Sequence, residues 1–176
     1  MKFTLWEIGS YLVIIGFWAF FLKVIKRNVT GDILVGAIMG FFLEFSTEPV
    51  ADYHFKITIY KDLPLIIPFA WGMMFALTTY LSEKLYSRLF HKTSVLLHDK
   101  RILILDLLIG LCVGFPLETV GTHAGVWNYN ATAIGWTLGT IPLFQMPWET
   151  LISYALIMLI GPTFVRYWQA AFEGRI

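Results

Sequence analysis

The chain carries one thirteen-residue pattern twice: Asp32-Ile-Leu-Val-Gly36-Ala-Ile-Met-Gly40-Phe-Phe-Leu-Glu44, and 74 positions later Asp106-Leu-Leu-Ile-Gly110-Leu-Cys-Val-Gly114-Phe-Pro-Leu-Glu118. Each copy spaces an aspartate, two glycines and a glutamate four residues apart within an apolar run. Residues four apart share one face of a helix. The pattern therefore predicts two equivalent helices that carry Glu44 and Glu118 at equivalent depths.

The composition excludes an ordinary water-soluble domain. Of the 176 residues, 57% are hydrophobic and only 14% are charged, with a net charge of +1. A helix that spans a membrane needs about 20 largely apolar residues. Apolar stretches of about this length or more occur at 5–22, 33–48, 64–82, 102–119 and 134–165. We expect an all-α integral membrane protein with five transmembrane helices.

The last apolar stretch is too long for one simple span, and it contains two prolines. We expect residues 134–146 to form an outer-surface or re-entrant segment, with Pro147 in the first turn of the final helix. A sixth helix that spans half of the membrane is the alternative.

The repeat also predicts the organisation of the chain. Residues 1–176 form a single membrane domain, in which 1–28 is an extra N-terminal helix, 29–90 is the first repeat and 103–168 is the second. Each repeat is a helical hairpin. Because both copies run in the same direction, they are parallel repeats, related by an axis along the membrane normal.

The basic residues predict the orientation. Placing the N-terminus outside a cell membrane and the C-terminus in the cytoplasm puts ten of the 13 Lys and Arg residues on the cytoplasmic side, as the positive-inside rule favours. The ten are Lys23, Lys26, Arg27, Lys84, Arg88, Lys92, Lys100, Arg101, Arg166 and Arg175.

A carboxylate inside an apolar membrane helix is costly, so the two repeated glutamates indicate a functional site. An axis between the repeats would bring Glu44 and Glu118 to the sides of one central cavity. We interpret Asp32 and Asp106 as N-terminal caps of their helices. The glycines between them either allow close helix packing or leave a groove for an elongated ligand.

Polar and aromatic residues crowd around the two glutamates. Paired carboxylates can act as acid and base, and aromatic rings can hold an apolar chain or stabilise a developing cation. The candidate catalytic residues are Glu44, Glu118, Glu48 and Glu149. The candidate substrate-binding residues are Tyr53, His54, His123, Trp127, Asn128, Tyr129, Trp148 and Trp71.

Other chemistries have less support. The four histidines show no HxxxH or HExxH spacing, and we find no phosphate-binding glycine loop and no nucleophile elbow. We expect no metal and no cofactor. The expected partners are membrane lipids and a lipid or isoprenoid ligand, with no nucleic acid.

One stretch carries a family resemblance: Gly114-Phe-Pro-Leu-Glu118-Thr-Val-Gly121-Thr-His-Ala-Gly125-Val-Trp127-Asn-Tyr129, followed by Ile141-Pro142-Leu143 and Trp148. It resembles the signature region of the membrane carotenoid hydratases, over residues 114–148. The resemblance implies acid-catalysed addition of water to an isoprenoid end group, with Glu118 as the matching acid.

Two functions follow from these patterns. The first is a membrane enzyme that performs carboxylate acid and base chemistry, such as hydration, cyclisation or isomerisation, on a lipid or isoprenoid. The second is a small proton-coupled transporter or channel that uses the same glutamates. A five-helix chain would need to form a homodimer to enclose a pathway.

Overall fold

The protein folds into five long helices joined by shorter segments. The computed structural model describes residues 2–47, 50–92, 95 and 99–175. The helices are α1 (Lys2–Phe20), α2 (Thr30–Thr47), α3 (Ile66–Phe90), α4 (Arg101–His123) and α5 (Trp148–Trp168). Short π-helical turns extend α1 over Phe21–Ile25 and α5 over Gln169–Glu173. The all-α prediction is thus correct.

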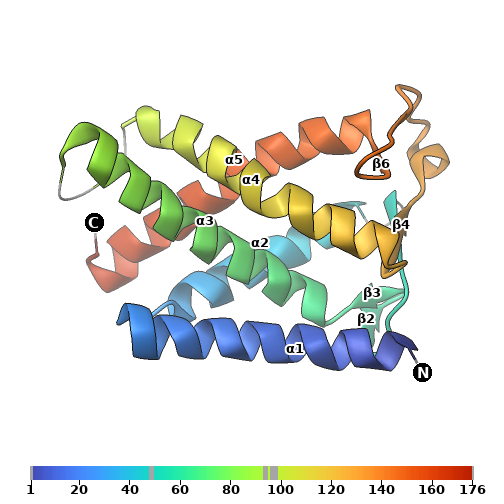
Figure 1. Cartoon of the computed structure of the whole chain (residues 1–176), viewed down its shortest axis with the longest axis horizontal. Coiled ribbons are helices and arrows are strands. Elements are labelled where there is room, and N and C mark those ends of the chain that lie inside the picture. Colours follow the sequence, from blue (N-terminus) through green and yellow to red (C-terminus); the bar gives the residue numbers. More distant parts are fainter. Residues whose placement is uncertain (1, 48–49, 93–94, 96–98, 176) are drawn as a thin grey trace.

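The helices run back and forth along the long axis of the molecule (Figure 1). Short strands and the N-terminus gather at one end, here called the strand end, and the C-terminus lies at the other, here called the C-terminal end. The strands are β1 (Ala51–Tyr53), β2 (Thr58–Tyr60), β3 (Leu63–Pro64), β4 (Trp127–Tyr129), β5 (Thr140–Ile141) and β6 (Met146–Pro147). They form three two-stranded antiparallel pairs, β1 with β4, β2 with β3 and β5 with β6.

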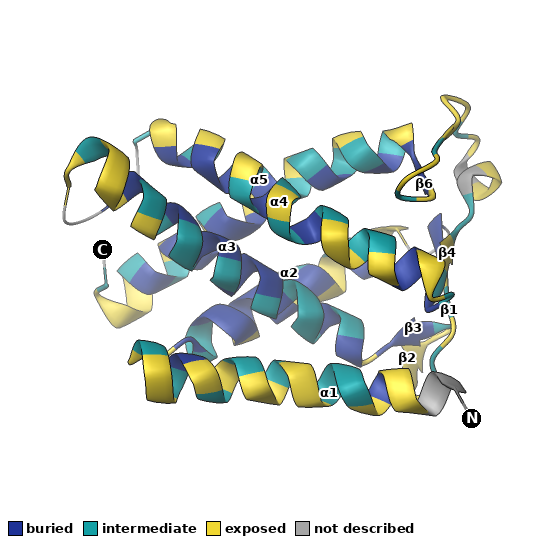
Figure 2. Cartoon of the chain, in the orientation of Figure 1, coloured by how far each residue is buried: buried dark blue, intermediate teal, exposed yellow. Residues whose placement is uncertain are grey.

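Four of the helices are long and apolar enough to cross a membrane: Leu5–Ile25, Thr30–Thr47, Arg101–His123 and Trp148–Glu173. Exposed residues occur along the outward faces of the helices (Figure 2). They include large apolar side chains such as Leu12, Phe42 and Leu156. An exposed apolar surface of this extent is typical of a membrane protein.

The remaining helix, α3, packs against the other four helices. Its last turns carry Glu83, Lys84 and Arg88, and its buried face carries the hydroxyls of Thr78, Thr79 and Ser82. A helix that is covered by its neighbours does not need an apolar surface all round.

Residues 134–146 do not form the alternative sixth helix. A single 3₁₀ turn, Ala131–Ile134, precedes the β5–β6 hairpin, which leads directly into α5. Pro147 has extended backbone and stands one residue before α5, not within its first turn. Its missing N–H therefore still costs the helix nothing.

The two aspartates are not caps, which corrects the sequence interpretation. The helix-starting N–H groups of Thr30 and Arg101 donate instead to Asn28, at 3.0 Å, and to Asp99, at 3.1 Å. Asp106 lies five residues into α4, which begins at Arg101, one residue before the apolar stretch. Asp32 does lie in the first turn of α2, but its side chain points into the bundle and is fully buried.

The repeated glycines are packing positions. A Cβ added to Gly36 would lie 2.7 Å from the Cα of Gly72. A Cβ added to Gly40 would lie 2.6 Å from Trp71, and one added to Gly110 would lie 2.5 Å from Met158. Gly114 lies against the ring of Tyr154 in the same way. The neighbouring helices thus fill the space beneath these four glycines' Cα atoms, so the glycines allow close helix packing and do not form the alternative groove.

Candidate functional site

The first glutamate of the repeat is held by two aromatic donors. Glu44 lies near the end of α2 and is only 5% exposed. The indole N–H of Trp71, on α3, donates to its Oε1 at 2.5 Å, and the hydroxyl of Tyr53, on β1, donates to its Oε2 at 2.7 Å. Both oxygens of Glu44 therefore have a partner.

The second glutamate is held by the same types of donor, but in a different arrangement. The hydroxyl of Tyr129 and the indole N–H of Trp127, both on β4, donate to Glu118 at 2.7 and 3.1 Å. Both bonds end on Oε2. Among the residues that the structure describes, none donates to Oε1 of Glu118. This oxygen is free to give or accept a proton.

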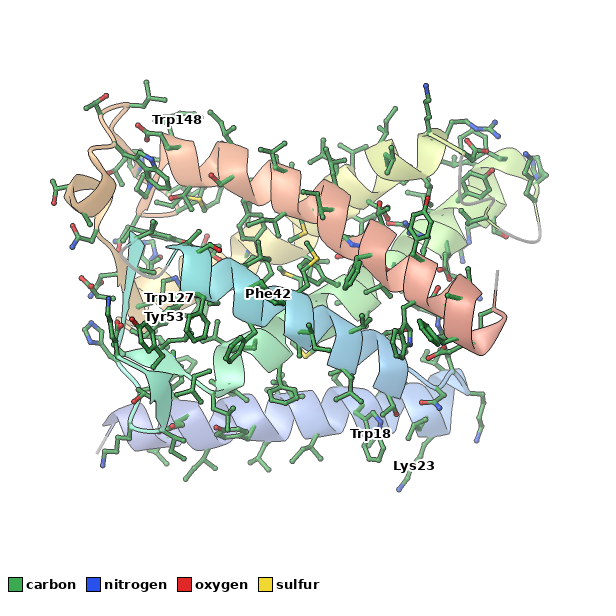
Figure 3. All side chains as sticks on the ribbon, turned by 180° about the vertical axis from the view of Figure 1, so that it is seen from behind. Trp18, Lys23, Phe42, Tyr53, Trp127 and Trp148 are labelled. Carbon is green, nitrogen blue, oxygen red and sulfur yellow. The ribbon has the colours of Figure 1, made fainter. Side chains whose placement is uncertain are left out.

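The β1–β4 strand pair joins the two glutamate clusters. Its register places Tyr53 opposite Trp127, and the centroids of the two rings are 6.3 Å apart. Figure 3 shows these two side chains next to each other at the strand end. Asn128 and His54 also bond across this pair, with 2.8 Å between Nδ2 and Nε2. Each half of the chain thus contributes one glutamate and one strand to a shared site.

The two tyrosines lie outside the helices and remain hydrogen-bond donors. Burial, together with the neighbouring glutamates, raises the pKa of the Tyr53 and Tyr129 hydroxyls well above the usual value for a phenol. Both hydroxyls therefore keep their protons at physiological pH. They can hold the carboxyl groups in place without exchanging charge with them.

Several predicted site residues lie elsewhere. Glu149 accepts hydrogen bonds from the backbone N–H groups of Thr137, at 2.8 Å, and Leu138, at 2.9 Å, and so organises the loop before α5. His123 is exposed, and its Nδ1 lies 2.9 Å from the carbonyl of Thr119. Glu48 lies outside the described residues.

The predicted tryptophans divide in the same way. Trp148 is 46% exposed and lies at the outer edge of the strand end (Figure 3), whereas Trp71 and Trp127 are donors to the glutamates. The structure thus brings together Glu44, Glu118, Tyr53, Trp71, Trp127 and Tyr129, with His54 and Asn128 beside them.

A second buried polar cluster, near the C-terminal end, was missed from the sequence. Arg166 of α5 holds Asp106 of α4 through two hydrogen bonds of 2.5 and 2.7 Å, and both side chains are almost fully buried. Asp32 accepts hydrogen bonds from Gln169, at 3.1 Å, and Arg175, at 2.5 Å. The sequence feature that could have predicted this cluster is Arg166, an arginine within an apolar helix. The count of basic residues had placed Arg166 on the cytoplasmic side.

Glu83 connects these ion pairs. Arg27, which precedes α2, donates to Glu83 at 2.5 Å and lies 3.8 Å from Asp32. Arg166 lies 3.8 Å from Glu83 on the other side. A continuous chain of charges thus links α2, α3, α4 and α5, and the polar residues are not confined to the strand end.

An apolar hollow lies on the outer surface of the bundle. It has a volume of about 250 Å³, and α2 and one residue of α5 line it: Ile38, Met39, Phe42, Leu43, Ser46 and Phe164. Phe42 is 69% exposed, so the hollow faces the surroundings of the protein. Its lining suits a hydrocarbon chain.

The site has no arrangement suited to a metal. Within the described part of the chain, no three His, Cys, Asp or Glu side chains lie close enough to hold a metal ion. The available chemistry is that of two carboxyl groups, two phenols and two indoles. No family model, no curated protein and no solved structure matches this chain.

Proposed function

We propose that this protein is an integral membrane enzyme that performs carboxylate acid and base chemistry on the end group of a lipid or isoprenoid. Hydration, cyclisation and isomerisation all begin when an acid protonates a carbon–carbon double bond. The observation that carries the proposal is the asymmetry at Glu118: two donors hold Oε2 and leave Oε1 available.

Glu118 is then the residue that exchanges the proton. Trp127 and Tyr129 fix its side chain, as a general acid or base requires. The resemblance to the membrane carotenoid hydratases agrees, because it also points to Glu118. Glu44, with both oxygens occupied and only 5% exposure, supports the site by holding Trp71 and Tyr53 in place.

The aromatic rings suit the intermediate of such a reaction. Protonation of a double bond creates a carbocation, and the faces of aromatic rings stabilise cations. Tyr53 and Trp127 lie side by side at the junction of the two clusters. The apolar outer surface of the bundle gives a lipid substrate access from the membrane.

The internal repeat supports a shared site. Tyr53 and Trp127 are 74 positions apart and face each other, and His54 and Asn128, also 74 apart, bond to each other. A two-fold axis between the repeats predicts such contacts between equivalent residues. Between α3 and α5 the offset is 83: Trp71 contacts Tyr154, and Glu83 contacts Arg166. The nine extra residues fall in the loop before α5.

We also propose that the strand end faces outward and the C-terminal end faces the cytoplasm. Lys23, Lys26 and Arg27 follow α1 at the C-terminal end, and Arg88 lies at the end of α3. Basic residues are concentrated on the cytoplasmic side of membrane proteins.

The test is native mass spectrometry with lipid identification on gently purified protein. The wild type should carry a specific isoprenoid or lipid, and E118Q should carry its unreacted form. The Thr163→Val variant, which lies far from Glu118 in the chain, serves as the control and should match the wild type. Bulk phospholipid alone in every sample would contradict the proposal.

One observation favours a proton-coupled transporter or channel instead. The charge chain near the C-terminal end places buried ionisable groups near both ends of the bundle, as a transport path requires. Proton flux into liposomes that contain the wild type, and its loss in E44Q and E118Q, would support this alternative. Equal flux in all three samples would remove it.

A further inference from the structure

Three hydroxyl side chains on α3 are completely buried, and two of them are unpaired. Thr78, Thr79 and Ser82 are each 0% exposed. The hydroxyls of Thr78 and Thr79 form no hydrogen bond with a residue in the described part of the chain, whereas that of Ser82 faces the carboxyl group of Asp106. A buried hydroxyl is destabilising unless a polar partner bonds to it.

Other helices of this protein satisfy such hydroxyls locally. Ser46, Thr119 and Thr163 each donate to the backbone carbonyl one turn earlier, at 2.8 Å in each case. The same type of carbonyl exists on α3, but Thr78 and Thr79 do not use it. Their hydroxyls therefore lack the backbone partner that the other helices provide.

The buried hydroxyls connect the two buried polar clusters. Met74, Thr78 and Ser82 are spaced four residues apart, so they form one row of about 12 Å along α3. At one end of this row the hydroxyl of Tyr154 donates to the sulfur of Met74 at 3.2 Å. At the other end Ser82 lies beside Asp106.

Tyr154 connects the row to the glutamates. Its ring lies 5.5 Å from that of Trp71, the residue that holds Glu44, and its hydroxyl lies against Gly114, one turn before Glu118 on α4. Sulfur is a weak acceptor, so the Tyr154 hydroxyl can turn to a stronger acceptor at small cost.

We propose that this row on α3 binds water molecules, which carry protons between the Asp106–Arg166 pair and Glu118. Hydroxyls and water both donate and accept hydrogen bonds, so a proton can pass along the row by successive transfers. Each transfer moves one proton, and no group is oxidised or reduced. The proton role rests on the proposed function: Glu118 gives a proton to the substrate, the carbocation or its water adduct then releases one proton to solvent water, and the row returns one proton to Glu118.

Water fits this space better than a metal cation. The row offers neutral hydroxyls, and Arg166 already holds both oxygens of Asp106. A hard cation needs several oxygen ligands with negative charge among them. A small neutral molecule that both donates and accepts matches the groups present.

Radiolytic footprinting of the purified full chain tests the water directly. Hydroxyl radicals made from bound water by an X-ray pulse oxidise adjacent side chains, which mass spectrometry then locates. We expect Met74 to be oxidised several-fold faster than Met158, which is 0% exposed and packed against Gly110. Equal protection of Met74 and Met158 would overturn the proposal.

Matched variants complete the test. The double variant T78V/S82A keeps the side-chain volumes close but removes two hydroxyls, so Met74 oxidation should fall to the level of Met158. T163V removes a hydroxyl that is satisfied within its own helix, and should leave Met74 unchanged. Unchanged oxidation of Met74 in T78V/S82A would overturn the proposal that this row binds water.

The proton role has a separate readout. T78V/S82A should slow conversion of the co-purified lipid several-fold while lipid binding is retained, and unchanged conversion would overturn proton supply by the row. E118Q should keep Met74 oxidation and lose conversion. If E118Q retains conversion, the proposed function fails. If Met74 is protected from oxidation in the wild type while E118Q loses conversion, the proposal that the row binds water fails and the proposed function stands.

Discussion

At the scale of single residues, Glu44 and Glu118 differ in how many of their oxygens are occupied. Trp71 and Tyr53 bond to separate oxygens of Glu44, whereas Tyr129 and Trp127 share one oxygen of Glu118. Because of this difference, the substitution Glu→Gln can separate a structural role of Glu44 from a chemical role of Glu118.

Glu→Gln should leave the stability unchanged at Glu118 and lower it at Glu44. The amide of E118Q can place its NH₂ at the unbonded Oε1 position and keep both donors, so its melting temperature in detergent should match the wild type. E44Q must place its NH₂ against Trp71 or Tyr53, which costs about 1–3 kcal/mol. Thermal unfolding of both variants checks this expectation, and an E118Q less stable than E44Q would contradict it.

Asp99 gives a second residue-level prediction, because it lies in the connection between α3 and α4. Hydrogen bonds from Arg101 and Tyr86 lower the pKa of its carboxyl well below the usual value. A lowered pKa in the folded state stabilises the fold above the unfolded pKa of about 4, and this contribution is lost as the pH falls toward the folded value.

Asp99→Asn should therefore lower the melting temperature at pH 7. The difference from the wild type should stay constant between about pH 5 and pH 8 and shrink below about pH 4, where the wild-type carboxyl begins to lose its advantage. Melting curves across this range provide the measurement. If the difference in melting temperature grows as the pH falls, the Asp99 carboxyl does not have a lowered pKa in the folded protein.

At the scale of elements, the close contact of α2 with α3 depends on glycine. A Cβ added at Gly72 would collide with the backbone carbonyl of Ile33, and backbone cannot move aside as a flexible side chain can. Gly16 on α1 is a matched control, because an added Cβ would meet nothing within 4 Å.

Gly72→Ala should destabilise the protein by about 1–3 kcal/mol, whereas Gly16→Ala should be neutral or stabilise it by up to about 1 kcal/mol. Chemical unfolding in mixed micelles measures both variants. Equal stability of the two variants would mean that the α2–α3 contact is looser than described.

The ion pair of Asp106 and Arg166 links α4 to α5. Asp106→Asn leaves a buried guanidinium without its main partner, and we expect a loss of about 3–5 kcal/mol. The double variant D106L/R166M removes both charges, so it should be more stable than D106N. Unfolding measurements compare these two variants, and a double-mutant cycle adds the single variants D106L and R166M. Additive losses in the cycle would contradict direct coupling of the pair.

The elements also show what the sequence could predict. The repeated glutamates and aromatic residues identified the site because their spacing survives in the fold: Glu44 and Tyr53 bond to each other, as do Glu118 and Tyr129. The pairing of Tyr53 with Trp127 could not be predicted, because it depends on a strand register between segments 74 residues apart. Propensity and periodicity describe local structure only.

The second cluster was missed for a different reason. Arg166 follows an apolar run, so counting charges assigned it to the cytoplasmic side, although it is 2% exposed. Its partner, Asp106, was interpreted as a cap because the repeat aligns it with Asp32, at the start of the first repeated helix. Both errors come from treating charges near helix ends as solvated, when a neighbouring helix buries them.

At the scale of the whole molecule, two buried polar clusters lie in a bundle whose outer surface is largely apolar. The glutamates occupy the strand end, and α3 connects them to the ion pairs near the C-terminal end. The bundle thus combines a surface suited to lipid with an interior that can hold and move protons. An enzyme that protonates a membrane-dissolved substrate needs both features.

Deuterium incorporation from the solvent shows whether this protein protonates a carbon atom of a lipid. Membranes that contain the wild type, E44Q or E118Q are incubated in D₂O, and the extracted lipids are analysed by mass spectrometry for deuterium bound to carbon. Hydration, cyclisation and isomerisation initiated by an acid all leave one such deuterium in the product. We predict a labelled lipid in the wild type and none in E118Q. The same labelled lipid in E118Q, or no carbon-bound deuterium in any sample, would contradict the account.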